Sequence, residues 1–233
     1  MSQGYANPYT VAGAVPSERA AFIRNTYIHL GFAIVAFILV EYFVLQQSWA
    51  GPFAQKMTGG RSWLIVLGAF MGVSWVANKF AMSDTSRGMQ YLGLGLFIVA
   101  EAIIFLPLLY VAANMSGDSQ IILKAGITTG CIFGGLTLAA FITKKDFSFL
   151  GSFLSIAFFV AMGIIVVSIL FGFNLGTLFA GAMALLAGGS ILYTTSNIMH
   201  HYRTDQHVAA ALSLFSSVAL LFWYILRIFM SRR

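Results

Sequence analysis

Seven long apolar stretches dominate this chain of 233 residues. A helix needs about 20 predominantly apolar residues to cross the hydrocarbon core of a bilayer, and each stretch has between 20 and 24. Backbone groups exposed to lipid must pair within their own segment, which favours helices. We therefore expect an all-α membrane protein, a bundle of seven transmembrane helices. The expected spans are Thr26–Gln47, Trp63–Met82, Tyr91–Ala113, Ile121–Ile142, Phe149–Phe171, Leu175–Ile198 and Val208–Met230.

The composition excludes several classes of protein. Hydrophobic residues make up 59% of the chain and charged residues only 9%, against about 25% charged in an average soluble domain. An ordinary soluble enzyme, a nucleic-acid-binding module and a disordered chain are therefore excluded. The net charge of +6 comes from single basic residues between apolar runs, which indicates membrane topology rather than a nucleic-acid partner. The single cysteine, Cys131, excludes an internal disulfide framework and a multi-cysteine metal site.

The chain is expected to contain one folded domain. Residues 1–25 are polar and lack an apolar core of the signal-peptide type, so we expect a mobile N-terminal tail. Residues 26–233 then form a single seven-helix transmembrane domain, because no connection is long enough for a second one. Only three residues separate Phe171 from Leu175, so the fifth and sixth spans are expected to be an antiparallel hairpin.

Basic residues near the span ends predict the orientation. Seven lie on the side of the N-terminus and six on the other, or three if the C-terminal end is left out. Basic residues favour the cytoplasmic side, and early loops dominate, so we place the N-terminus in the cytoplasm. Six full spans plus one re-entrant segment would bring the basic C-terminal end to the same side, and that alternative stays open.

Glycines spaced four residues apart indicate close helix packing, within the chain or between copies. The two pairs are Gly68 with Gly72 and Gly172 with Gly176, and the triplet is Gly126, Gly130 and Gly134.

Glu101 is the strongest single candidate for function. It is the eleventh residue of a 23-residue span, so it lies near the middle of the bilayer. A carboxylate there costs about 2.5–3.5 kcal/mol on insertion scales unless it is protonated, paired or hydrated. Two interpretations follow: a group that responds to protons or cations in an internal cavity, or a protonated side chain bonded to a neighbouring helix. Glu41, nearer a span end, is expected to reach the headgroups or pair with a basic residue.

Two polar stripes follow the sixth and seventh spans. Ser190, Thr194, Asn197 and His201 share one helix face, and Ser213, Ser217 and Tyr224 share another. Facing each other, such stripes either form hydrogen bonds between helices or line a narrow hydrated path.

Catalytic and metal-binding patterns are missing from the sequence. We find no nucleophile with a matching base and no zinc-ligand spacing, so we expect neither an enzyme nor a cofactor. His200, His201 and His207 at the turn between the last two spans are interpreted as interfacial residues.

Five segments in order along the chain carry a family resemblance. They are FIRNTYIHL at 22–30, EAIIFLPLL at 101–109, TKKDFSFLGSFL at 143–154, LYTTSNIMHHY at 192–202 and AALSLF at 210–215. Together they resemble the Bax inhibitor-1 family, and most closely its bacterial branch of YccA-like proteins that modulate the membrane-anchored AAA protease FtsH. The resemblance implies a seven-helix bundle with the last helix in the centre, in the inner membrane of a bacterial cell and with a cytoplasmic N-terminus.

The resemblance also implies a function for particular positions. Better-understood members resemble pH-sensitive calcium leak channels in which two aspartates share a proton and contact an arginine. The aspartate positions correspond here to Thr194 and Ser217, and the arginine falls near Asn78 or Lys79. Threonine and serine do not change charge between pH 5 and 8, so this chain lacks that sensor, and Glu101 is the residue left to titrate.

Two functions from different classes therefore remain. The first is a regulatory membrane protein that modulates a membrane AAA protease of the FtsH type. The second is a pH-sensitive leak for calcium or other cations, or protons, with Glu101 as the titrating group and with the polar stripes, including Asn197 and Ser213, along its path. A proton-coupled transporter is disfavoured, because its paired broken helices are missing.

Overall fold

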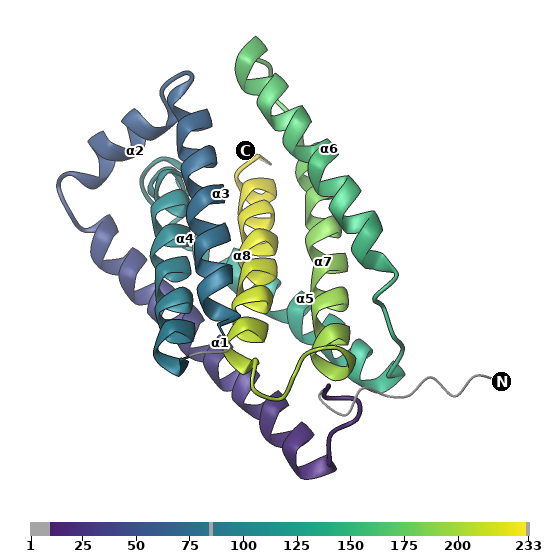
Figure 1. Ribbon diagram of the computed structural model, residues 1–233. Coiled ribbons are helices and arrows are strands. Elements are labelled where there is room, and N and C mark those ends of the chain that lie inside the picture. Colours follow the sequence, from purple (N-terminus) through teal and green to yellow (C-terminus); the bar gives the residue numbers. More distant parts are fainter. Residues whose placement is uncertain (1–9, 84–85, 232–233) are drawn as a thin grey trace.

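The computed structural model describes residues 10–83 and 86–231, and over these residues the chain is all-helical, with one isolated β-bridge between Thr10 and Arg203 (Figure 1). Seven of its helices are long and apolar enough to cross a membrane, as predicted. The helices are α1 (Pro16–Leu45), α2 (Ala50–Thr58), α3 (Ser62–Ala81), α4 (Arg87–Met115), α5 (Ile121–Thr143), α6 (Leu150–Phe171), α7 (Gly176–His200) and α8 (His207–Ser231).

The first helix starts ten residues before the expected span. α1 begins at Pro16, where proline occupies a first-turn position that needs no backbone N–H bond. Its 30 residues correspond to about 45 Å of helix, more than the hydrocarbon core requires. Residues 16–25 are thus helical although too polar to count as membrane-spanning, and residues 1–9 of the expected tail lie outside the described part.

A short helix that the sequence analysis did not predict follows α1. α2 has nine residues, too few for a span. Its buried Ala50 and Ala54 pack against Leu106 of α4, with Tyr110 beside them. α2 is therefore a cap on the bundle between two spans.

The last helix lies in the centre of the bundle. α8 packs against α1, α3, α4, α5 and α7, and 67% of its most apolar window is buried inside the protein. α6 is peripheral: it packs mainly against α7, touches α3, and buries only 11% of its window. Figure 1 shows α8 between these neighbours, with α6 tilted so that it lies farther from α3 at the lower end of the view than at the upper end. The predicted central last helix is thus confirmed, with five of the other six spans as its main neighbours.

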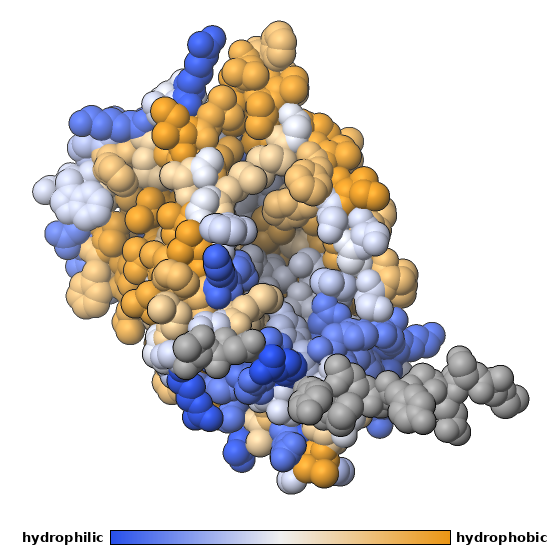
Figure 2. Space-filling model, in the orientation of Figure 1, coloured by the Kyte–Doolittle hydropathy of each residue, from blue (hydrophilic) through white to orange (hydrophobic). Residues whose placement is uncertain are grey.

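The surface matches a protein that lies in lipid. Figure 2 shows hydrophobic residues over the sides of the bundle and hydrophilic residues gathered at its lower end, near the α7–α8 connection. Large side chains on α6 point outward, among them Phe153 at 65% and Phe159 at 79% exposure. In water, a protein that exposes this much apolar area would aggregate, whereas a bilayer covers it.

One glycine brings two helices into close contact. A Cβ atom on Gly93 of α4 would lie 2.5 Å from the carbonyl oxygen of Ala77 and 2.6 Å from the amide nitrogen of Ala81 on α3. Only glycine allows this approach.

The glycine ridges predicted from the sequence do not have this role within the chain. A Cβ atom would meet nothing within 4 Å at any ridge glycine of α3 or α5, that is, at Gly68, Gly72, Gly126, Gly130 and Gly134. That part of the packing prediction is wrong, because spacing alone does not show which face a ridge occupies; contact between copies stays a prediction. Gly172 and Gly176 instead have φ of 72° and 67° and turn the chain between α6 and α7, which makes the predicted hairpin.

Candidate functional site

The polar stripes of α7 and α8 face each other, as the sequence suggested. Ser190 and Ser217 are joined by a hydrogen bond of 2.8 Å between their hydroxyl oxygens. The Ser217 hydroxyl also donates to the carbonyl of Ser213 at 3.1 Å, and the Tyr202 hydroxyl donates to Ser213 Oγ at 3.0 Å. A chain of hydrogen bonds therefore extends from the middle of α8 to the α7–α8 connection, and the bond between Ser190 and Ser217 is the one in it that joins the two helices.

Glu101 borders a large cavity that this contact also borders. Its side chain is in the middle of α4 and only 5% exposed. The cavity has a volume of about 770 Å³ and is also lined by Ser190 and Ser217, so Glu101 and the serine pair share one space. It is the one acidic residue among the described residues that line it.

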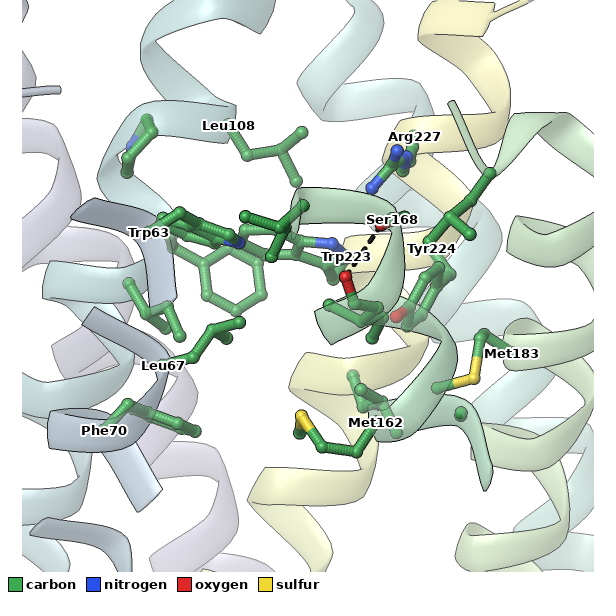
Figure 3. Close-up of a pocket in the computed structure, with 18 of the residues that line it drawn as sticks. Trp63, Leu67, Phe70, Leu108, Met162, Ser168, Met183, Trp223, Tyr224 and Arg227 are labelled. Carbon is green, nitrogen blue, oxygen red and sulfur yellow. Dashed lines mark hydrogen bonds between the residues drawn. The ribbon is translucent and has the colours of Figure 1, made fainter. Parts of the chain in front are cut away.

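The cavity runs from mid-membrane to the end of the bundle that holds the α6–α7 turn. Residues of α3, α4, α6, α7 and α8 form its walls. Most are apolar or aromatic, and Figure 3 shows Trp63, Phe70 and Met162 around it. Arg227 and Tyr224 line its outer part. Its inner end is polar and acidic, and its outer end carries a basic group.

Other candidate residues lie nearer the opposite end of the bundle. Asn197 lines a smaller hollow of about 350 Å³, together with His201, Tyr202 and Gln206. Thr194 is buried at 5% exposure on α7, between the serine contact and this hollow. The structure thus places Glu101 and Ser217 on the lining of one cavity, and Asn197 and Thr194 farther along α7.

Asn78 and Lys79 do not join this site. The Asn78 amide donates to the carbonyl of Ser74 in its own helix at 2.9 Å. Lys79 is exposed, with its ammonium 5.4 Å from the ring centroid of Trp75, which is itself 67% exposed. Neither residue borders either cavity, and α3 therefore contributes no cation to Glu101 from these positions.

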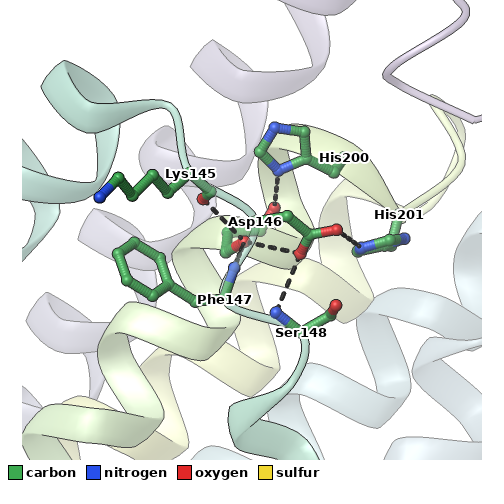
Figure 4. A network of polar contacts seen from close by, with 7 residues as sticks. Lys145, Asp146, Phe147, Ser148, His200 and His201 are labelled. Carbon is green, nitrogen blue, oxygen red and sulfur yellow. Dashed lines mark hydrogen bonds and ion pairs between the residues drawn. The ribbon is translucent and has the colours of Figure 1, made fainter.

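A polar network fastens the α5–α6 connection to α7 (Figure 4). Asp146 accepts from the backbone N–H of Ser148 at 2.9 Å and contacts the His201 ring at 3.0 Å. The Ser196 hydroxyl accepts from the backbone N–H of Phe147 at 2.8 Å. Burial alone would raise the pKa of Asp146, but the hydrogen bonds from Ser148 and the contact with His201 outweigh it and lower that pKa below its usual value.

The sequence analysis quoted this turn as a motif but did not single out Asp146. A carboxylate two residues before a serine, between two spans, is the signal that identifies such a turn.

The three histidines do not form a metal site. His201 contacts Asp146, and His200 contacts the carbonyl of Ser196 at 2.9 Å. His207 lies against His29 of α1, with ring centroids 4.9 Å apart. Over residues 10–83 and 86–231 no group of three histidine, cysteine or acidic side chains could hold a metal ion.

Glu41 differs from its expected position. It is 4% exposed, and neither carboxylate oxygen has a hydrogen-bond partner. One turn earlier, Phe37 packs against Phe105 of α4 and Phe215 of α8, so Glu41 lies on the buried face of α1. The expected contact with headgroups or a basic residue is wrong, because this face of α1 points into the bundle.

Known proteins resemble the chain over nearly its whole length. An uncharacterised protein of Pseudomonas aeruginosa is 27% identical, with 95% of each chain covered. Protein LIFEGUARD 4 of Arabidopsis thaliana is 30% identical, covering 92% of this chain and 86% of the relative. Bax inhibitor 1 of Schizosaccharomyces pombe is also 30% identical, covering 96% of this chain and 81% of the relative. The family model described as inhibitor of apoptosis-promoting Bax1 matches residues 19–233, and the chain therefore belongs to the Bax inhibitor-1 family.

Proposed function

We propose that the protein is a pH-sensitive leak for calcium or other cations in which Glu101 is the titrating group. The observation that carries this proposal is the position of Glu101, a mid-membrane carboxylate that borders a cavity together with Ser190 and Ser217. An acidic side chain within a membrane span is costly, so its presence there points to a function. An ionised Glu101 would attract cations, and a protonated one would not.

The arrangement of polar groups supports a path with a closed point. The cavity leads inward as far as the serine contact, and the smaller hollow lined by Asn197 opens on the other side of it. Ser213 lies between the two, and its hydroxyl accepts from Tyr202, which lines the smaller hollow. The hydrogen bond between Ser190 and Ser217 closes the path at 2.8 Å, and separating α7 from α8 there would join the two spaces.

Calcium flux into dye-loaded proteoliposomes tests the proposal. We expect flux that rises with pH in the natural protein and loses this dependence in Glu101→Gln. Glu41→Gln is the matched control, because Glu41 is equally buried but does not border the cavity, and it should keep the dependence. No flux at any pH would refute the leak, and the same pH dependence in both variants would refute Glu101 as its titrating group.

We also propose a second function, modulation of a membrane AAA protease of the FtsH type, in the inner membrane of a bacterium and with the N-terminus in the cytoplasm. One observation favours it. Val11 is fully buried, its N–H donates to the carbonyl of Tyr202 at 2.9 Å, and Thr10 bridges to Arg203. The chain before Thr10 therefore starts from a fixed point beside the α7–α8 connection, where a protease in the same membrane could contact it.

Turnover of a membrane substrate in cells tests this second function. We expect deletion of residues 1–9 to change the protease-dependent turnover rate. Replacing those residues by a glycine–serine segment of equal length shows whether their sequence or only their length matters. If removing the whole protein leaves turnover unchanged, modulation is refuted. With a cytoplasmic N-terminus and seven spans, the C-terminus lies outside the cell membrane, and a phosphatase fused to it should be active there.

A further inference from the structure

The large cavity is continuous with the lipid-facing surface of the protein. α3 and α6 form two of its walls and touch each other only slightly. Met71 of α3 and Phe158 of α6 line the cavity and are also 52% and 43% exposed. Figure 1 shows the two helices diverging, and Figure 2 shows hydrophobic residues along the flanks of this face. A molecule dissolved in the bilayer can therefore enter from the side.

The lining selects an apolar occupant. Trp63 and Trp223 stack with ring centroids 6.2 Å apart, and Phe105 meets Trp223 edge-on at 4.9 Å. Aromatic and aliphatic walls with a few polar groups are typical of small-molecule sites, whose volumes run from about 300 to 1,000 Å³. The volume of about 770 Å³ lies in that range.

One basic side chain is placed to bind an anion at the mouth of the cavity. Arg227 lines the outer part, one turn from the aromatic wall of Trp223 and beside Tyr224 (Figure 3). No carboxylate within the described residues forms an ion pair with Arg227. Glu101, the one acid that borders this cavity, is at its inner end in the middle of α4. Arg227 thus keeps donors for a phosphate group near the membrane surface.

We propose that this cavity binds one anionic phospholipid of the surrounding bilayer. An acyl chain enters between α3 and α6 and lies against Trp63, Phe105 and Trp223, and the headgroup phosphate pairs with Arg227. The charge of Arg227 favours anionic over zwitterionic headgroups. A lipid bound in the cavity excludes water from it and would therefore close the proposed cation path at this point. Lipid binding is measured without an ion gradient, so its failure can be told apart from failure of the leak.

The first test measures lipid preference. The full-length protein, stripped of lipid in detergent, is titrated with phosphatidylglycerol or phosphatidylcholine of identical chains, and bound lipid is counted by native mass spectrometry. We expect a preference for phosphatidylglycerol that falls about fivefold in Arg227→Gln, the size expected for one basic group beside anionic lipid. Arg227→Lys should keep it, as should Lys124→Gln, a basic residue of α5 that is exposed and does not line the cavity.

The second test locates the acyl chain. In a Trp49→Phe, Trp75→Phe background, which removes two tryptophans that are 50% and 67% exposed, the remaining fluorescence comes from Trp63 and Trp223. We expect phosphatidylglycerol with brominated chains to quench this fluorescence more than brominated phosphatidylcholine, with the difference lost in Arg227→Gln.

Three results would overturn the inference. The first is equal binding of the two lipids by the natural protein. The second is an equal loss of preference in Lys124→Gln and Arg227→Gln. The third is quenching of Trp63 and Trp223 by aqueous iodide but not by brominated lipid, which would identify the cavity as a water-filled vestibule.

Discussion

Replacing Gly93 by alanine is expected to weaken the contact between α3 and α4. The new Cβ would lie 2.5 Å from the Ala77 carbonyl oxygen, 2.6 Å from the Ala81 nitrogen and 3.0 Å from Phe80 Cβ. The two closest atoms belong to the α3 backbone, so no change of side-chain rotamer can remove the overlap, and the helices must separate. Overpacking of this kind costs about 1–3 kcal/mol.

Gly130→Ala is the matched control for this variant. Both substitutions exchange glycine for alanine inside a helix and share the same gain of about 1 kcal/mol in helix propensity, but a Cβ on Gly130 meets nothing within 4 Å. The difference in unfolding free energy between the two variants therefore isolates the overlap, at about 1–3 kcal/mol. At about 2–4 °C per kcal/mol, this corresponds to roughly 2–12 °C in Tm.

The difference in Tm between the two variants is measured by thermal melting of the purified proteins in a single detergent, with size-exclusion chromatography as the readout. Ala77→Gly should not rescue Gly93→Ala, because the clashing atom is a carbonyl oxygen that the substitution leaves in place. Equal melting temperatures for the Gly93 and Gly130 variants would show that the close approach of α3 and α4 described here is wrong.

Three further predictions concern polar groups. Asp146→Asn should increase amide exchange in the α5–α6 connection at pH 6. Because the pKa of Asp146 is lowered in the folded state, the ionised side chain stabilises the fold above about pH 4, and this stabilisation is lost as the pH falls further. The exchange rates of the variant and the natural protein should therefore converge in acid. Glu41→Leu should raise the free energy of unfolding by about 1–3 kcal/mol, because both carboxylate oxygens are buried without partners; a lower melting temperature would contradict this. Ser217→Ala should lower the free energy of unfolding by about 0.6 kcal/mol through loss of the bond to Ser190. The double variant with Ser190→Ala should lose no more than Ser217→Ala alone.

The seven spans could be predicted because hydropathy reports directly on the membrane. The same signal could not locate the start of α1, since Pro16–Asn25 is helical but polar. It also could not find α2, whose nine residues depend on packing against Leu106 of α4. Ends and short caps are determined by contacts between segments, and a hydropathy window contains no such contacts.

The candidate site was partly predictable. Glu101 was recognisable from one carboxylate in an apolar span, and the facing stripes from their spacing; the bond between Ser190 and Ser217 confirms that they meet. The cavity itself, and the position of Arg227 on its lining, could not be predicted, because both depend on how the helices pack and on the slight contact between α3 and α6. Gly93 was overlooked for a similar reason: it has no glycine partner four residues away, and its importance comes from the backbone opposite.

The central position of α8 has a consequence for how the protein is made. Ribosomes deliver α8 after the other six spans, so these enter the membrane before the helix that five of them pack against is present. The interfaces that bury 67% of the most apolar window of α8 can form only once α8 itself has been synthesised, and until then α1, α4 and α7 present unfilled faces to the insertion machinery. The centre of the bundle is therefore the last part to assemble, and a nascent chain that is truncated before His207 lacks the central helix and is a target for quality control.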